Sequence, residues 1–172
     1  MVVKFQNKIL IGITLFLSLF LLHALTYADN NSPIDLTADT ANVDYLHRIN
    51  TYTGNVHVHN TDSTLDGDKI ITYRNTKHQI IKMIDYGNLA HYHTMTDPKN
   101  PPLDAYAKII KFYPLQHHII LIGNGFVQNG DNTMRAPIIH YNTLQKVVRS
   151  TATKTERTHI MIDQNGTMRI TG

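Results

Sequence analysis

Paired histidines are the residues of this sequence that most readily suggest chemistry. His57-Val58-His59 and His91-Tyr92-His93 each place two imidazoles on one side of an extended strand, and His117-His118 is a further pair. Imidazole nitrogens bind zinc and copper, so these pairs could supply metal ligands. No carboxylate recurs at a fixed spacing beside them, and polar residues that alternate on a solvent-facing strand explain the pattern equally well. We therefore predict no metal site, and weak binding by the first two pairs stays open.

Acidic residues offer a second candidate site. Asp66-Gly67-Asp68 could form part of a calcium site or an acid/base pair, but its place just before an expected strand favours a turn. The sequence contains no Gly-x-Ser-x-Gly elbow, no P-loop and no His-Glu-x-x-His motif. We therefore expect neither an enzyme nor a cofactor.

The N-terminus separates sharply from the rest of the chain. Lys4 and Lys8 precede an almost continuously apolar run from Ile9 to Leu25, and Thr26-Tyr27-Ala28 then supplies small residues at the positions of a cleavage site. We expect a signal peptide over residues 1–28, cut after Ala28, and one exported domain over residues 29–172. An uncleaved membrane anchor is the alternative, because the run is just long enough to span a bilayer.

The charge and the absence of cysteine argue against nucleic-acid binding, disulfide bonds and thiolate metal sites. The formal net charge is +3, but removal of Lys4 and Lys8 leaves acidic and basic residues nearly balanced. The remaining basic residues are scattered, whereas nucleic-acid binding calls for a basic stripe. The absence of cysteine excludes disulfides and thiolate metal sites. Stability must come from packing and strand pairing.

The exported part has the pattern of an all-β protein. Apolar residues alternate with polar ones or form short runs, and Gly, Asn, Asp and Pro punctuate them at short intervals. No long segment has a helical pattern. The expected strands are Val43–Tyr45, Tyr52–His59, Lys69–Arg74, Ile80–Tyr86, Leu89–Thr94, Ala107–Tyr113, His118–Ile122, Gly125–Gln128, Pro137–Tyr141, Lys146–Ser150 and Thr158–Asp163.

A short motif recurs within these strands. Gly54-Asn55-Val56-His57-Val58 matches Gly123-Asn124-Gly125-Phe126-Val127, and Gly87-Asn88 begins a weaker third copy. Both Gly and Asn tolerate positive φ, so we expect each Gly-Asn pair to turn the chain. Repeats of this length must stack to bury their apolar faces, which predicts an elongated β-body with two open ends.

These motifs carry a family resemblance. Ser32 to Asp39, Thr51 to Val58, Asp66 to Ile70 and Ile122 to Gln128 resemble, in this order, the LptA (OstA-like) family of lipopolysaccharide-export proteins. The resemblance implies a twisted β-jelly roll of stacked V-shaped antiparallel layers, open at both ends. It also implies a periplasmic protein whose copies join head to tail and carry lipopolysaccharide between an inner-membrane LptC-like protein and an outer-membrane LptD-like protein.

An apolar groove would shield the acyl chains of lipid A from water. Strand parity places Ile34, Leu36 and Ala38 on one face, as it does Val56 and Val58. On the family pattern Ile34, Tyr92, Tyr113 and Leu115 fall where acyl chains meet the interior. The alternative is that these residues fill an ordinary sandwich core. The predicted lipid-binding residues are Ile34, Leu36, Val56, Val58, Tyr92, Tyr113 and Leu115.

The two ends of such a sheet would be docking edges. Pairing of the last strand of one copy with the first strand of the next is a contact that does not close, and it builds a filament. The predicted edge residues are Ile34, Leu36 and Ala38 at one end and Ile160 and Ile162 at the other. The C-terminal edge is expected at about residues 153–172, where Asn165-Gly166 suggests a further hairpin that could dock or cap.

Two other functional classes stay open. One is a membrane-anchored relative of the LptC type, which would keep its N-terminal helix. The other is a β-solenoid enzyme acting on polysaccharide, which would need a carboxylate cluster on one exposed face.

Overall fold

Ten antiparallel strands make up almost all of the ordered secondary structure in the computed structural model, which describes residues 34–95 and 101–162. The expected all-β class is confirmed in this part of the chain, where the sole helical element is a short 3-10 turn. The elements are β1 (Asp35–Thr37), β2 (Thr40–Asp44), β3 (Ile49–Asn60), β4 (Ser63–Arg74), β5 (Ile80–Thr94), β6 (Leu103–Tyr113), η2 (Pro114–Gln116), β7 (His118–Asn129), β8 (Asn132–Asn142), β9 (Val147–Thr151) and β10 (His159–Met161).

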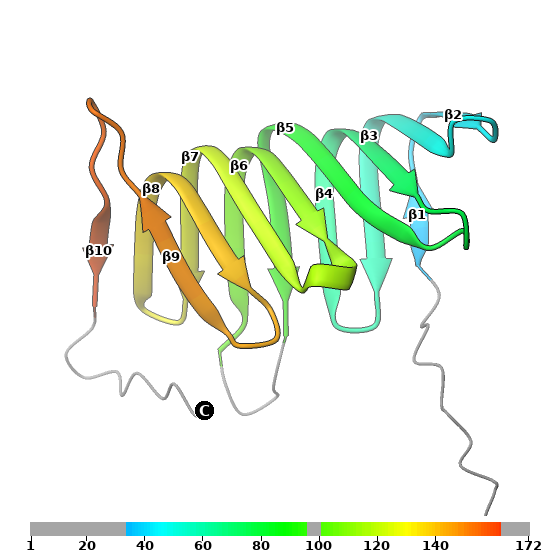
Figure 1. Cartoon of the computed structure of the whole chain (residues 1–172). Helices are drawn as coiled ribbons and strands as arrows, with labels where there is room; N and C mark the ends of the chain where they lie inside the picture. The colour runs from blue at the N-terminus through cyan, green and yellow to red at the C-terminus, as the bar shows by residue number, and fades with distance from the viewer. Residues whose placement is uncertain (1–33, 96–100, 163–172) are drawn as a thin grey trace, which may run out of the picture. The chain divides into compact units, whose positions relative to one another are not determined.

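The strands form one sheet with two separate ends. Its order is β1-β3-β4-β5-β6-β7-β8-β10, while β2 also pairs with β3 and β9 also pairs with β8 (Figure 1). From β3 to β8 each strand pairs with the next one along the chain. The sheet therefore ends at β1 and β2 on one side and at β9 and β10 on the other, and it does not close into a barrel.

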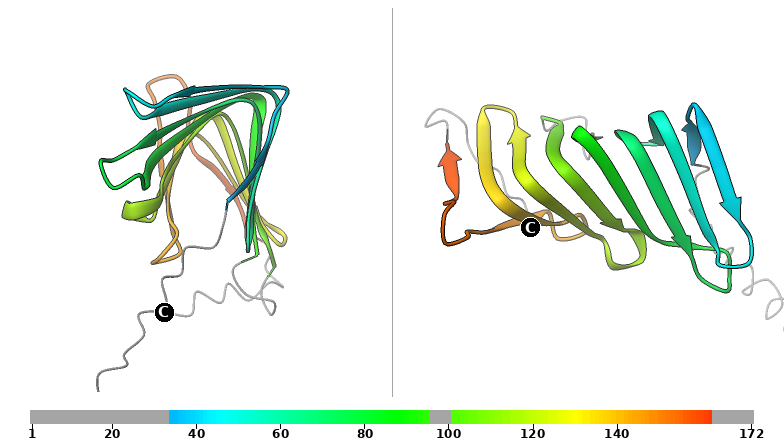
Figure 2. Two further views of the ribbon diagram at one scale, coloured as in Figure 1. Left: turned by 90° about the vertical axis from the view of Figure 1, so that its right-hand side faces the viewer. Right: turned by 90° about the horizontal axis from the view of Figure 1, so that it is seen from above.

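Bulges in the middle of the long strands fold this sheet over. The register between β3 and β4 shifts between Thr53 and Val56, and the register between β7 and β8 shifts between Ile122 and Gly125. Comparable shifts interrupt the β4–β5, β5–β6 and β6–β7 pairings. A bulge bends its strand and increases the local twist. Seen from the β1 end, the bent strands fold the sheet into an open V (Figure 2).

The Gly-Asn pairs lie at these bulges. Gly54 and Asn55 have φ values of 79° and 46°, and Gly123 and Asn124 have 78° and 56°, so the expected positive φ is confirmed for these two pairs. It is wrong for the third pair, because neither Gly87 nor Asn88 has a positive φ. The pairs do not separate strands, however. The predicted strands Ile80–Tyr86 and Leu89–Thr94 are one continuous strand, β5, and the predicted strands His118–Ile122 and Gly125–Gln128 are likewise one strand, β7. The reason is that a bulge bends a strand while the chain stays paired with its neighbours. Asp66-Gly67-Asp68 likewise lies inside β4, so the predicted turn there is wrong.

Two of the bulges are hydrogen-bonded to an aspartate from an adjacent part of the sheet. The Asp39 N–H donates to the carbonyl of Gly54 at 2.9 Å, and Asn55 Nδ2 donates to Asp39 Oδ2 at 3.0 Å. The Asn88 N–H similarly donates to Asp68 Oδ2 at 3.2 Å. In two of the three copies the motif is therefore a bulge together with an aspartate that is hydrogen-bonded to it.

The V has two walls, one on each side of the bulges, and both contribute to a single hydrophobic cluster. In the first wall Ile70, Ile110, Leu121 and Ile139 are almost completely buried. In the second wall Val58, Leu65, Tyr92 and Val127 are buried. No helix in the described ranges is long and apolar enough to cross a bilayer.

Gly67 makes room for a buried side chain. A Cβ at this position would lie 1.8 Å from Asp85 Oδ1 and 2.6 Å from Asp85 Cγ. Asp85 is fully buried, so the overlap falls on a side chain inside the core. We therefore expect Gly67→Ala to lower the free energy of unfolding by about 2 kcal/mol through overpacking, measured by urea denaturation. In the double variant Gly67→Ala/Asp85→Ala the added methyl group has space, so additive losses would contradict this explanation.

Candidate functional site

An unbroken row of apolar side chains crosses the second wall from one end of the sheet to the other. Each member faces its neighbours in adjacent strands, because the pairings of all eight strands of the main sheet order place them directly opposite one another. The row, here called the apolar row, consists of Leu36, Val58, Leu65, Tyr92, Ala105, Val127, Met134 and Ile160. Cross-strand neighbours on one face lie about 5 Å apart, so the row is a continuous apolar strip.

The side chains in the middle of the apolar row are buried, and those at its ends are partly or fully exposed to solvent. Val58, Leu65 and Tyr92 are buried, and burial raises the pKa of the Tyr92 phenol. Leu36 and Met134 pack against the core while partly buried, and Ile160 is exposed. The strip therefore becomes accessible where the sheet stops.

The predicted lipid-binding residues divide between this row and its surroundings. Leu36, Val58 and Tyr92 belong to the apolar row, and Val56 is buried beside it. Tyr113 is half-buried at the end of β6. Ile34 and Leu115 are 44% and 52% exposed, the latter in η2. The structure thus brings three of the seven predicted residues into one row, and the buried ones also serve as core.

Sequence reasoning missed Leu65, Ala105, Val127 and Met134. One signal for Val127 was present, because Val58 and Val127 each stand four residues after the glycine of their Gly-Asn pair. The third copy is out of step by one residue, since Tyr92 stands five residues after Gly87. Without the register of the bulges, the other row members could not be assigned to a face.

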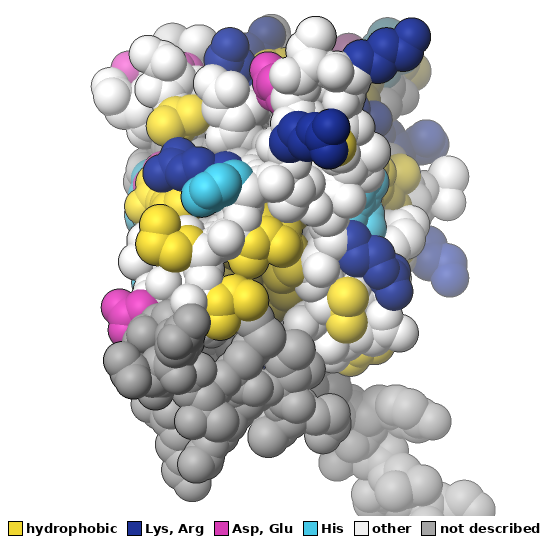
Figure 3. Space-filling view, turned by 90° about the vertical axis from the view of Figure 1, so that its left-hand side faces the viewer, with side chains coloured by type: hydrophobic (Ala, Val, Ile, Leu, Met, Phe, Trp, Pro, Cys, Tyr) yellow, Lys and Arg dark blue, Asp and Glu magenta, His cyan; other side chains and the backbone are white. Residues whose placement is uncertain are grey.

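Exposed apolar side chains gather at the two ends of the sheet. At one end they are Ile34, Val43, Tyr45 and Leu46, and at the other Ile160, Met161 and Ile162. Figure 3 views the β10 end, where hydrophobic side chains lie near the middle with Lys and Arg around them. The predicted edge segments are thus at opposite ends of the sheet, since β1 contains Leu36 and β10 contains Ile160. Asn165-Gly166, the signal segment and its cleavage site lie outside the described residues.

The opposite face of the second wall carries a row of polar and aromatic side chains. Directly opposed across the strands are Thr37, His57, Asp66, His91, Tyr106, Phe126, Arg135 and His159. This polar row is offset by one residue from the apolar row, as strand parity requires. One wall therefore presents an apolar strip inward and a polar strip outward.

Histidines and aspartates interact within and beside the polar row. His57 Nδ1 is hydrogen-bonded to Asp66, and Asp104 Oδ1 lies 2.9 Å from both His91 Nε2 and His93 Nδ1. Partial burial alone would raise the pKa of Asp104, but its hydrogen bonds to His93 and His91 outweigh this effect and lower the pKa. No carboxylate recurs at a fixed spacing beside these histidines in the sequence, and the carboxylates that contact them come from the adjacent strands β4 and β6.

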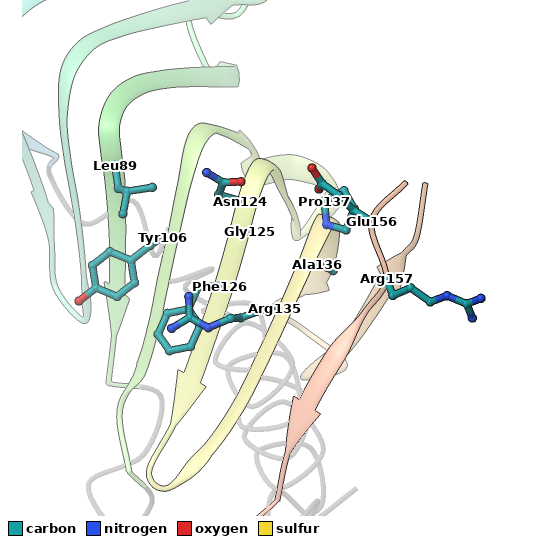
Figure 4. A pocket seen from close by; sticks show the side chains of 10 residues that line it. All are labelled: Leu89, Tyr106, Asn124, Gly125, Phe126, Arg135, Ala136, Pro137, Glu156 and Arg157. Carbon is teal, nitrogen blue, oxygen red and sulfur yellow. The ribbon is translucent and has the colours of Figure 1, made fainter. Parts of the chain in front are cut away.

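A shallow cavity of about 670 Å³ lies farther along the polar row. Tyr106, Phe126 and Arg135 line it together with Leu89 and residues that precede β10 (Figure 4). The Arg135 guanidinium stacks over the Phe126 ring at 4.2 Å, whereas the Arg157 side chain points away from that ring. The lining combines aromatic and apolar side chains with the charged residues Arg135, Glu156 and Arg157.

Comparison with known proteins gives a consistent result. Residues 35–147 match the family model described as "LptA/(LptD N-terminal domain) LPS transport protein". The lipopolysaccharide export system protein LptA of Escherichia coli K12 is 26% identical over 159 residues, which cover 90% of this chain and 85% of that protein. LptH of Pseudomonas aeruginosa is 25% identical over 123 residues, covering 72% and 70%.

A solved structure shares the fold. The crystal structure of Pseudomonas aeruginosa LptH, described as the LptA-homologous periplasmic component of a lipopolysaccharide transport device, superposes with a TM-score of 0.72 at 23% sequence identity. The match covers 78% of this chain and 98% of that one, and it confirms the expected twisted β-jelly roll. Because the family model spans most of the described strands, from β1 to the start of β9, this chain belongs to the LptA/(LptD N-terminal domain) family of LPS transport proteins.

Proposed function

We propose that this protein binds lipopolysaccharide in the periplasm and carries it from the inner to the outer membrane. The observation that carries the proposal is the apolar row, which runs from Leu36 to Ile160 without a polar interruption. Each CH₂ of an acyl chain left in water costs about 0.8 kcal/mol, so an apolar strip that reaches both ends of the sheet lowers the cost of crossing an aqueous compartment. Family membership and the names of the relatives support the same function.

In this proposal the acyl chains of lipid A enter between the two walls, while the sugar headgroup stays in water. Tyr113 and Leu115 at the end of β6 and in η2 are accessible apolar side chains that acyl chains can meet first. Entry deeper into the V needs the walls to separate around Tyr92. The protein binds and transfers its ligand without chemical conversion.

Head-to-tail assembly completes the conduit. The first strands of one copy would pair with the last strands of the next, which would join one apolar row to another. An LptC-like protein at the inner membrane and an LptD-like protein at the outer membrane would occupy the terminal edges. Signal cleavage after Ala28 would free the body from the membrane.

Photocrosslinking tests where the lipid binds. A photoreactive amino acid at Tyr92, Tyr113 or Leu115 is expected to crosslink to lipopolysaccharide, whereas the same group at Tyr106 on the outer face is not. Equal crosslinking on both faces would contradict an internal binding site.

A charge at the margin of the V should weaken lipid binding. We expect Tyr113→Asp to reduce affinity for lipopolysaccharide about tenfold, because the bound acyl chains would bury an unpaired carboxylate. The matched control is Leu144→Asp, at an exposed leucine in the turn between β8 and β9. Circular dichroism would verify the β-fold of both variants. Unchanged affinity in folded Tyr113→Asp would remove Tyr113 from the binding surface.

A further inference from the structure

Three potential metal ligands converge on the outer face of the second wall. His91 and His93 belong to β5 and Asp104 to β6, and His93 is paired directly opposite Asp104. Asp104 Oδ1 lies 2.9 Å from His91 Nε2 and 2.9 Å from His93 Nδ1, and all three ligand atoms lie within 4.8 Å of one another. Tetrahedral ligands of one zinc ion stand about 3.3 Å apart, so small side-chain rotations would admit an ion.

The ligand types select the class of ion. Two imidazoles and one carboxylate match the nitrogen and oxygen ligands of zinc and its neighbours among the divalent transition metals. Calcium and magnesium instead require mostly oxygen ligands. Three protein ligands leave a fourth position for water, and the side chains of His91, His93 and Asp104 are 27%, 32% and 27% exposed, so an ion can approach from solvent.

Neighbouring side chains already orient one of the ligands. His91 Nδ1, the ring nitrogen that would face away from the ion, lies 3.7 Å from Asp66 Oδ2, an ion-pair contact that is longer than a hydrogen bond. A carboxylate on the second nitrogen of a ligating histidine is a recurring feature of metal sites, where it sets the tautomer and the ring orientation. Tyr106 stacks on the His91 ring with centroids 4.3 Å apart and planes inclined by 6°. His57 is hydrogen-bonded to the other oxygen of Asp66 and so holds that carboxylate in place.

A second histidine pair provides an internal comparison. His118 Nε2 lies 3.2 Å from His140 Nδ1 on β7 and β8. Within residues 34–95 and 101–162, however, only His91, His93 and Asp104 form a cluster of three or more potential ligands. The His118–His140 pair therefore has the same side-chain type without the carboxylate.

We propose that His91, His93 and Asp104 form a binding site for one divalent transition-metal ion of the zinc class, with Asp66 as the outer partner of His91. The ion would link β5 to β6 one residue away from Tyr92 and Ala105 of the apolar row. This site is on the opposite face from the lipid and is independent of the proposed transport function.

Calorimetric titration with zinc chloride, on protein without a polyhistidine tag, tests the site. We expect one ion per chain and no saturable binding of calcium or magnesium. His93→Ala and Asp104→Asn should each reduce zinc affinity more than tenfold, and Asp66→Asn should reduce it about tenfold, as loss of an outer partner does in other metal sites. His118→Ala should bind zinc like the unaltered protein. Cobalt substitution should give the visible absorption of a tetrahedral site.

Three outcomes would overturn the site. They are an absence of saturable zinc binding, undiminished affinity in folded Asp104→Asn, and loss of binding in His118→Ala. All substitutions are at partly exposed positions, and circular dichroism would verify that each variant is folded. Where His93→Ala lost its fold, His93→Gln would give the same test with a side chain closer in size.

Discussion

Replacement of Asp85 by asparagine is expected to stabilise the protein at neutral and alkaline pH, by about 3 to 5 kcal/mol at pH 9. Asp85 is 0% exposed and lies between Ile70 and Ile110 in a cross-strand row of the first wall. Neither of its carboxylate oxygens has a hydrogen-bond partner in the described part of the chain. Burial, and then the negative charges of Asp66 and Asp68, raise the pKa of Asp85 to about 8.

The sign of the pH dependence follows from this raised pKa. Below the ordinary pKa of 3.8 the carboxyl group is protonated in both the folded and the unfolded chain. Between 3.8 and about 8 only the folded chain keeps the proton, so the free energy of unfolding falls as the pH rises, by up to about 1.4 kcal/mol per unit. Above this range both states are ionised and the loss is complete. Asparagine has no such titration and retains the shape of the side chain.

Urea denaturation of Asp85→Asn and the unaltered protein at pH 5, 7 and 9 measures this effect. The difference in unfolding free energy should be small at pH 5 and grow toward pH 9. Asp131→Asn, at an exposed turn between β7 and β8, removes a charge without removing a buried group and should show no such growth. Parallel stability profiles for Asp85→Asn and the unaltered protein would contradict an Asp85 pKa near 8.

Lysines at either end of the sheet are expected to abolish head-to-tail assembly. Ile160→Lys/Ile162→Lys would place charges on the C-terminal edge, and Ile34→Lys/Val43→Lys would do so on the N-terminal edge, where exposed apolar side chains now stand. Charged edge strands resist pairing with another sheet. Each double variant should be a monomer at concentrations where the unaltered protein forms chains, with association weakened at least about a hundredfold. Leu89→Lys introduces the same charge at an exposed leucine of β5, in the middle of the sheet, and should assemble normally.

A mixing experiment distinguishes a head-to-tail contact from a symmetric one. Each blocked variant keeps one unaltered end, so a mixture of the two should form dimers and nothing longer. Light scattering over a range of concentrations would report the masses. Dimers of a single blocked variant would indicate a symmetric contact. Failure of the unaltered protein to associate at all would contradict edge pairing.

Most of the strands could be predicted because each carries its own pattern. Alternation in segments such as Tyr52–His59 indicates an extended chain with one buried face, and the turns between strands contain the expected polar residues. The bulges could not be placed in the same way. A Gly-Asn pair permits both a turn and a bulge, and the choice depends on pairing with strands elsewhere in the chain.

The candidate site was less predictable because it depends on register. Each bulge changes which residues face the interior, so parity counted from Val58 along one strand says nothing about Tyr92 on another. The association of His93 with Asp104 is likewise set by the β5–β6 pairing and not by spacing. Asp85 is hidden in an apolar segment, where its burial depends on the space left by Gly67.

Because the apolar and polar rows are offset by one residue, the register of a strand that pairs with the sheet edge decides which of its two rows continues the apolar row. A strand that docks against β10 with its own apolar residue opposite Ile160 extends the apolar row. A register shift of two residues preserves that continuity. A shift of one residue would set Thr37, the polar-row member of β1, opposite Ile160 and interrupt the apolar strip. A junction between copies would therefore keep the apolar row continuous only if its register is shifted by an even number of residues.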